Sequence, residues 1–285
     1  MIPATTLEFF GDCKEVLAFY ASIFETDNTP IKTYHDMPLA DVFGITSANL
    51  DMVWQTNLDI IVGESRVRLD LSDSLLVAMD RLPSTNKTFP FTPVFRIEHP
   101  DESFLLNLIE KLNPALSDNK KSLPLTISDK YGILWQLHTA PEPSIFCCFD
   151  FDGFCKEVLS HYSDCFGITP SSITQYTDAP YPDKILKSVL TFTEGDCAYP
   201  FLFNDTLDSA TYGTNTYDPN ALLFYKHTNP ILSLLSNDKD KLSDVFNKLT
   251  SGAKNNKPLD LTSADFPQGS LIDKFGLCWN FGTCL

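Results

Sequence analysis

The chain has 285 residues, 43% of them hydrophobic, and its 37 acidic and 21 basic residues give a net charge of −16. This length suits two domains of roughly 100–150 residues each. The negative charge opposes binding to nucleic-acid phosphates and to anionic membranes, so we expect neither as a partner. No apolar run approaches the ~20 residues of a membrane span, and the first residues lack the pattern of a secretion signal. We therefore expect a cytoplasmic protein.

The N-terminal part of the chain predicts a strand, a helix and a hairpin in that order. Residues 6–10 (TLEFF) are typical of a strand and end at Gly11-Asp12. Apolar residues then follow helical spacing from Cys13 to Phe24, with Asp12 at the helix start. After a strand at 31–36, residues 58–73 contain two β-rich runs joined by Gly63-Glu64-Ser65, which indicates a hairpin.

The next part of the chain repeats this plan in shorter form. Residues 92–98 predict a strand, and the following helix is indicated by apolar residues at helical spacing, namely Leu105, Leu108, Ile109 and Leu112. A final strand is expected at 131–137 (YGILWQL). The predicted order of a strand, a helix and further strands therefore occurs twice before residue 139.

The second half of the chain repeats the first. GDCKEVLAFY at 11–20 and GFCKEVLSHY at 153–162 agree at seven of ten positions, 142 residues apart, and DKYGILWQL at 129–137 returns as DKFGLCWNF at 273–281. A period of this size is that of a whole domain. Residues 139–144 (TAPEPS) contain two prolines and no apolar pattern. We therefore expect an α+β protein with a first copy at 1–138, a linker at 139–144 and a second copy at 145–285.

These motifs together resemble the glyoxalase/bleomycin-resistance/dioxygenase, or vicinal-oxygen-chelate, superfamily. The opening is a strand, a glycine and then Glu-Val-Leu-x-x-Tyr, with a Phe four residues later. Tyr-x-Asp-x-Pro at 34–38 and Asp-Lys-Tyr/Phe-Gly-x-x-Trp in both copies are similar to the phosphonate-operon B-like (PhnB-like) branch. The resemblance implies two tandem domains, each made of paired βαβββ modules that curl into a cup with helices outside. Because single-domain relatives pair, it also implies a pseudo-dimer within one chain, present as a monomer or homodimer.

The resemblance further implies where ligands would lie. Metal-using members hold a divalent ion with His, Gln or Glu from the first and last strands of a module. The matching positions here include Asp70 and Gln136 in the first copy and Cys147 and Asn280 in the second. No position provides a histidine, so no complete metal site is expected; Asp70 and Gln136 are the weak candidates should a divalent metal bind. A shift of one residue in strand register would exchange the face to which these side chains point.

Two further residues are candidates for contact with a ligand. His35 lies in the Tyr-His-Asp-Met-Pro connection, which borders the cup in relatives, and Trp54 lies in a connection that the second copy lacks. No nucleophile with its base can be assigned from spacing alone, because such sets are assembled in space.

Three functions remain open from the sequence. The first is a small-molecule-binding protein whose cup, in one or both copies, has no complete metal site and for which no cofactor can be assigned. The second is a metal-dependent lyase, isomerase or dioxygenase of the same superfamily. The third is a degenerate structural scaffold.

Overall fold

The structure is a computed structural model. It describes residues 1–26, 30–37, 44–73, 94–116, 122–151, 153–175, 184–205, 231–253, 255–261 and 268–282. Statements below about what the molecule lacks refer to these residues.

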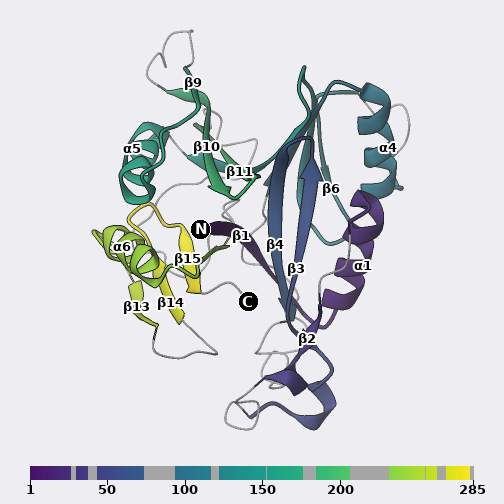
Figure 1. The fold of residues 1–285 in the computed structure, drawn as a ribbon. Helices are drawn as coiled ribbons and strands as arrows, with labels where there is room; N and C mark the ends of the chain where they lie inside the picture. The colour runs from purple at the N-terminus through teal and green to yellow at the C-terminus, as the bar shows by residue number, and fades with distance from the viewer. Residues whose placement is uncertain are drawn as a thin grey trace.

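The described chain forms four successive modules, each a strand followed by a helix and further strands (Figure 1). Module 1 contains β1 (Ile2–Phe9), α1 (Cys13–Phe24), β2 (Lys32–Thr33), β3 (Val53–Val62) and β4 (Ser65–Asp73), with short 3-10 turns η1 (Tyr34–Asp36) and η2 (Ser47–Asn49). Module 2 contains β5 (Val94–His99), α4 (Glu102–Leu112), β6 (Leu125–Ser128) and β7 (Leu134–Thr139). Module 3 contains β8 (Ser144–Phe151), α5 (Cys155–Phe166), β9 (Ser172–Gln175), β10 (Ile185–Glu194) and β11 (Cys197–Asp205). Module 4 contains β12 (Ile231–Leu235), α6 (Lys239–Leu249), β13 (Asn255–Asp260), β14 (Gln268–Ile272) and β15 (Cys278–Gly282).

Pairing between the first strands of the modules joins each module of the first half of the sequence to a module of the second half. In module 1 the first strand β1 pairs with the last strand β4 in parallel, and β12 pairs with β15 in the same way in module 4. Strand β1 then pairs with β12 antiparallel, and β5 pairs with β8 antiparallel. Module 1 therefore shares a curled sheet with module 4, and module 2 shares one with module 3. A single residue pair, Ser65 with Ala198, connects the two sheets at the ends of their hairpins.

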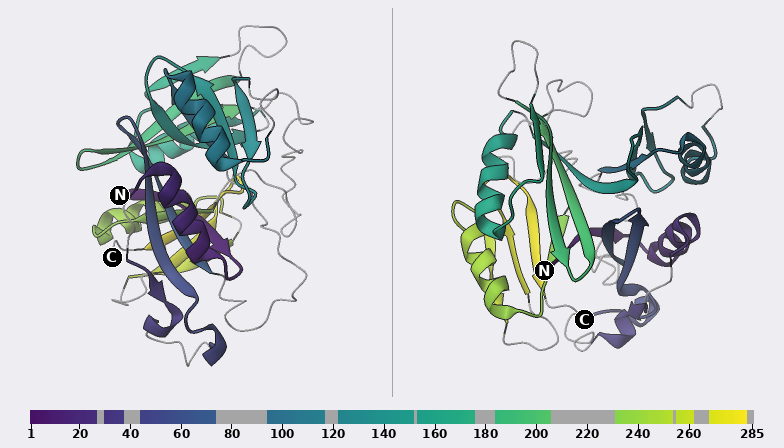
Figure 2. Two further views of the ribbon diagram at one scale, coloured as in Figure 1. Left: turned by 90° about the vertical axis from the view of Figure 1, so that its right-hand side faces the viewer. Right: turned by 45° about the horizontal axis from the view of Figure 1, so that its top comes forward.

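Helix packing joins the modules within each half of the sequence, module 1 to module 2 and module 3 to module 4. Helix α1 contacts α4 and helix α5 contacts α6, on opposite sides of the molecule (Figures 1 and 2). Tyr20 on α1 donates a hydrogen bond to Asp129 of module 2, and Tyr162 on α5 donates one to Asp273 of module 4. The modules thus form a closed ring in which strand pairing and helix packing alternate.

The expected α+β architecture of strand–helix–strand modules is confirmed, but the partners within each sheet differ from the expected ones. Each copy was expected to close its own cup, whereas each sheet takes one module from 1–138 and one from 145–285. Sequence order could not reveal this, because a first strand can pair with either of the similar first strands that the repeat provides. Thr5 and Cys147, which are 142 residues apart, lie in contact, so the pseudo-twofold axis passes beside them.

A buried aspartate at the end of each large hairpin fixes the start of the preceding helix. The carboxylate of Asp73 accepts hydrogen bonds from the backbone N–H groups of Gly11 and Cys13 at 2.9 and 3.1 Å, and from that of Val53 at 2.8 Å. Asp205 accepts from Cys155 and Ile185 at 2.9 and 2.8 Å in the second copy. The bonds from Cys13 and Cys155 satisfy first-turn helix N–H groups that have no intrahelical acceptor. Together with the bonds from Val53 and Ile185, they orient helix and hairpin alike in both halves.

Candidate functional site

Each curled sheet has one face packed against helices and one face without them. Because side chains alternate along a strand, the residues between the core-facing ones line the helix-free side. We call the helix-free side of modules 1 and 4 face A, and that of modules 2 and 3 face B. On β4, for example, Val67, Leu69 and Leu71 are buried in the main core, while Arg68 and Asp70 point to face A.

Four polar residues occupy the four central strands of face A. Asp70 on β4 pairs in register with Thr6 on β1, and Ser233 on β12 pairs with Asn280 on β15. The Thr6 and Ser233 hydroxyls lie 2.7 Å apart, and Ser233 Oγ donates to Asp70 Oδ2 at 3.4 Å. This group, which we call the face A cluster, comes from the first and last strands of modules 1 and 4. Asp70 and Asn280 belong to different copies of the repeat, yet they line the same face.

Burial changes the acid–base behaviour of the face A cluster. Loss of hydration raises the pKa of Asp70 to about 6, against the opposing effects of Ser233, Arg68 and Gln55. A carboxyl group with this pKa changes protonation in the range where many enzymes and binding proteins work, so it can accept or donate a hydrogen bond.

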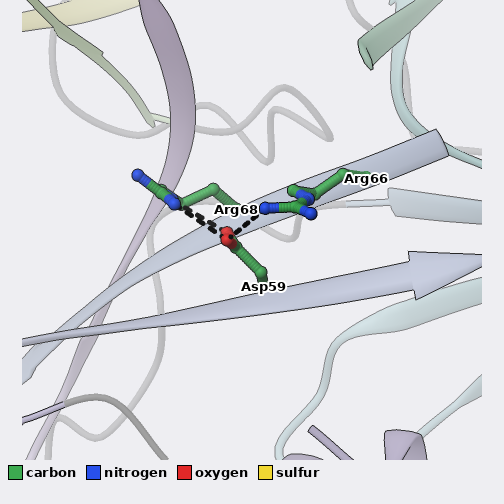
Figure 3. A network of polar contacts seen from close by, with 3 residues as sticks. All are labelled: Asp59, Arg66 and Arg68. Carbon is green, nitrogen blue, oxygen red and sulfur yellow. Dashed lines mark hydrogen bonds and ion pairs between the residues drawn. The ribbon is translucent and has the colours of Figure 1, made fainter. Parts of the chain in front are cut away.

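The arginines of face A are held by an acidic residue of the neighbouring strand. Arg68 donates two hydrogen bonds to Asp59, from Nε and Nη2, both at 2.8 Å (Figure 3). Arg66 Nη1 donates to the same carboxylate at 3.1 Å. Asp59 on β3 and the two arginines on β4 thus form a cross-strand ion-pair group beside the face A cluster.

Face B is apolar where face A is polar. Its strands contribute a separate buried cluster, which consists of Val94, Phe146, Cys148, Val189 and Leu202. The partly buried Leu134 packs against this cluster. Charged and polar residues flank this cluster: Glu98 on β5 accepts from Arg96 and from Lys187, and Gln136 on β7 pairs in register with Arg96. The two helix-free faces therefore differ in chemistry although the sequence repeats.

The two weak metal candidates lie on different faces. Asp70 is on face A and Gln136 is on face B, because modules 1 and 2 contribute to different sheets. Among the described residues no group of three or more His, Cys, Asp or Glu side chains is arranged to hold a metal ion. The face A cluster offers one carboxylate, one amide and two hydroxyls, which does not fit the ligand preferences of a catalytic transition metal.

The assignment of Cys147 to the cup is off by one residue. Cys147 is fully buried in the main core, and its Sγ lies 3.4 Å from Thr5 Oγ1, whereas Cys148 belongs to the face B cluster. Strand β8 is buried on nearly all of its length on both sides. A strand buried on both sides loses the alternating pattern that reveals its register.

His35 and Trp54 lie outside both faces. His35 is exposed on η1, and its backbone N–H bonds the carbonyl of Leu50. Trp54 packs beside a small cluster that contains Tyr34 and Met37, with the Lys32 ammonium 5.8 Å from its ring centre. Both therefore belong to the small lobe around β2 that extends from module 1 (Figure 1).

Several residues that line the faces were not identified from the sequence. Ser233, Arg96, Glu98, Lys187 and His138 come from strands whose mutual pairing was unknown. Only Arg96 and Glu98 gave a signal, since two charges alternate with apolar residues in the short strand VFRIE. Burial disfavours the thiolate form of the two cysteines of β8: it raises the pKa of Cys147 to about 12, and burial together with the Asp150 carboxylate also raises the pKa of Cys148.

No helix in the described part of the chain combines the length and the apolar character needed to cross a membrane.

Comparison with known proteins finds similarity in fold. No protein-family model and no curated protein matches the sequence. A solved PhnB protein from Bacillus cereus, which also bears a 3-demethylubiquinone-9 3-methyltransferase name, is 18% identical with a TM-score of 0.36 and covers 49% of this chain and 98% of its own. Protein PA1353 from Pseudomonas aeruginosa is 23% identical with a TM-score of 0.35, over 48% of this chain and 93% of its own. The 2,3-dioxygenase LapB from Pseudomonas sp. KL28 is 10% identical with a TM-score of 0.30, over 99% of this chain and 91% of its own.

These similarities concern the fold alone. The strand order and pairing described above define the fold of this chain independently of them.

Proposed function

We propose that this chain is a small-molecule-binding protein of the glyoxalase/bleomycin-resistance type, which binds a polar organic ligand on face A without a metal ion. The observation that supports this most directly is the face A cluster. Its four members converge from β1, β4, β12 and β15, the strands that would provide ligands in a metal-using relative. Their hydroxyl, amide and carboxyl groups can form directional hydrogen bonds to an organic molecule.

A metal-dependent reaction fits these residues less well. A divalent ion needs two or three converging carboxylate, imidazole or thiolate ligands, and Asp70 is the one such group in the face A cluster. Asn280 and Ser233 are weak ligands by comparison. A scaffold without a ligand does not explain face A, because polar side chains from four strands lie together at the centre of its sheet.

The test combines metal analysis with ligand screening on one pair of proteins. Wild type and Asp70→Asn would be purified without added metal and titrated with nickel, manganese and zinc, and then screened against a library of polar metabolites by thermal shift. We expect no stoichiometric metal in either protein, and at least one compound that raises the melting temperature of wild type more than that of Asp70→Asn. A stoichiometric ion that disappears in Asp70→Asn would contradict the proposal in favour of a metal-dependent enzyme. The absence of any compound with an Asp70-dependent shift would favour the scaffold.

A further inference from the structure

Face B contains a group of charged residues that neither the repeat nor the proposed function explains. Glu98 is almost fully buried, and its Oε1 accepts from Arg96 Nη2 at 2.7 Å and from Lys187 Nζ at 2.8 Å. Arg96 and Glu98 lie on β5 in the first half of the sequence, and Lys187 lies on β10 in the second. Two cations thus share one carboxylate oxygen on a face whose centre is apolar.

The arrangement leaves an excess of positive charge at this end of face B. His138, which pairs in register with Glu98, has its pKa lowered to about 4 by burial and by Arg96 and Lys187, against the opposing effect of Glu98. The imidazole is therefore neutral near pH 7 and offers a hydrogen bond without a charge. The group formed by Arg96, Lys187 and Glu98 is thus locally positive in a chain whose net charge is −16.

A further carboxylate, that of Asp150, lies on the same side of β8 as Phe146 and Cys148 and accepts a hydrogen bond from Asn204.

The Arg96 guanidinium is only partly used. It contacts Glu98 through Nη2, while its Nε is buried and has no hydrogen-bond partner among the described residues. An arginine commonly binds a carboxylate through two parallel N–H groups, and a buried donor without an acceptor costs free energy. A second carboxylate, supplied by a ligand at the exposed parts of the Arg96 and Lys187 side chains (23% and 32% exposed), would balance the excess charge.

Apolar side chains adjoin the charged group. The Lys187 ammonium lies 5.3 Å from the ring centre of Phe146, and Phe146 belongs to the buried face B cluster. Leu134, on the same side of β7 as Gln136 and His138, is only partly buried. A ligand held by Arg96 would therefore meet apolar surface next to the cations.

We propose that face B is a second binding site, selective for a small apolar monocarboxylate held by Arg96 and Lys187, with His138 and Gln136 as neutral hydrogen-bonding neighbours. This site differs from face A in location and in ligand chemistry. It is formed only when modules 2 and 3 pair, because Arg96 and Lys187 come from different halves of the chain.

The test uses phenylacetate as the probe and 2-phenylethanol as its neutral counterpart of similar shape. Isothermal titration of the full chain is expected to show binding of phenylacetate and none of the alcohol. Arg96→Met should weaken phenylacetate binding at least about tenfold, the size expected for loss of a charge-assisted hydrogen bond. Arg96→Lys, which keeps the charge but lacks the planar guanidinium with its several N–H donors, should fall between wild type and Arg96→Met. Sodium sulfate serves as a control for binding of any anion.

Two matched variants separate this site from face A. Arg66→Met removes an arginine that, like Arg96, is paired with a carboxylate, but on face A. Asp70→Asn changes the face A cluster, and both variants should bind phenylacetate as wild type does. Circular dichroism would establish that Arg96→Met is folded, and Lys187→Met provides an independent variant if it is not. The proposal is overturned if the alcohol or sulfate binds as well as phenylacetate, if wild type binds none, or if folded Arg96→Met binds unchanged. Since Asp70→Asn tests face A separately, either proposal can fail without the other.

Discussion

The most strongly repeated residues of the chain form a buried polar group that joins modules. Asp129 Oδ2 accepts from Tyr20 and from the indole of Trp135, at 2.6 and 2.9 Å, and its Oδ1 accepts two backbone N–H groups. Asp273, Tyr162 and Trp279 repeat this arrangement in the second half. A buried carboxylate with four donors is satisfied in spite of its burial. The tyrosine, aspartate and tryptophan that recur in both halves therefore hold helix and sheet together.

At the same scale, Asp70 provides a prediction about pH. Its pKa is about 6 in the folded protein, compared with about 3.9 for an unfolded aspartate. Between these values the folded state binds more protons than the unfolded state, so this residue lowers the free energy of unfolding as the pH rises from 4 to 6 and has no further effect above 6. Asp70→Asn should remove this loss and be more stable than wild type by about 1–3 kcal/mol at pH 7.5, with little difference at pH 4.

Urea unfolding of both proteins at several pH values measures this difference. Other buried carboxyl groups with raised pKa values, such as those of Asp129 and Asp273, titrate in both proteins and cancel in the comparison. Parallel stability curves for wild type and Asp70→Asn would show that Asp70 is hydrated and that the face A cluster is not formed.

At the scale of elements, the sequence predicts more of the helices than of the strand partners. The apolar stripe from Cys13 to Phe24 and its copy from Cys155 to Phe166 match α1 and α5. A helix is specified by its own residues, since the stripe is local. Strand pairing depends on residues far apart in the chain, and Asp70 and Asn280 could be placed on one face only after β1 was seen to pair with β12. Cys147 was misplaced because neither side of β8 is polar enough to mark the exposed one.

The two large hairpins allow a matched comparison between the halves. Gly63 in the β3–β4 turn and Gly195 in the β10–β11 turn have φ of 62° and 59°, in the left-handed region. A Cβ on Gly63 would overlap the backbone carbonyl of Pro143, whereas a Cβ on Gly195 would meet nothing within 4 Å. Gly195→Ala should cost about 1–2 kcal/mol of conformational strain. Gly63→Ala should cost about 1–3 kcal/mol more, because packed backbone must move.

Urea denaturation of the two variants and wild type tests this difference. Pro143 directly precedes β8, in the segment that connects the two halves of the sequence. The contact therefore packs this connecting segment against the β3–β4 hairpin of module 1. Equal losses in the two variants would mean that this crossing is not packed on the hairpin.

At the scale of the whole molecule, the ring of modules implies that the halves 1–138 and 145–285 do not unfold separately. Strand pairing connects module 1 to module 4 and module 2 to module 3, while helix packing and the tyrosine–aspartate bonds connect modules 1 to 2 and 3 to 4. Every module is thus held by two neighbours, one from each half. Opening either strand-paired interface exposes apolar surface of both halves, which favours a single cooperative transition.

Leu232→Ala tests this cooperativity. Leu232 is fully buried on β12 in the second half, paired with Thr5 of β1 and Trp279 of β15. Its truncation should lower the free energy of unfolding by about 2–5 kcal/mol. Hydrogen exchange followed by mass spectrometry should show the same loss of protection in the slowest amides of β4 and β7, in the first half, as in β15. Lys248→Ala, which removes an exposed ion pair with Asp244 on α6, is the control and should leave protection unchanged. Faster exchange confined to residues 145–285 would show two independent domains, and faster exchange in β4 and β15 but not in β7 would show that each curled sheet unfolds as its own unit.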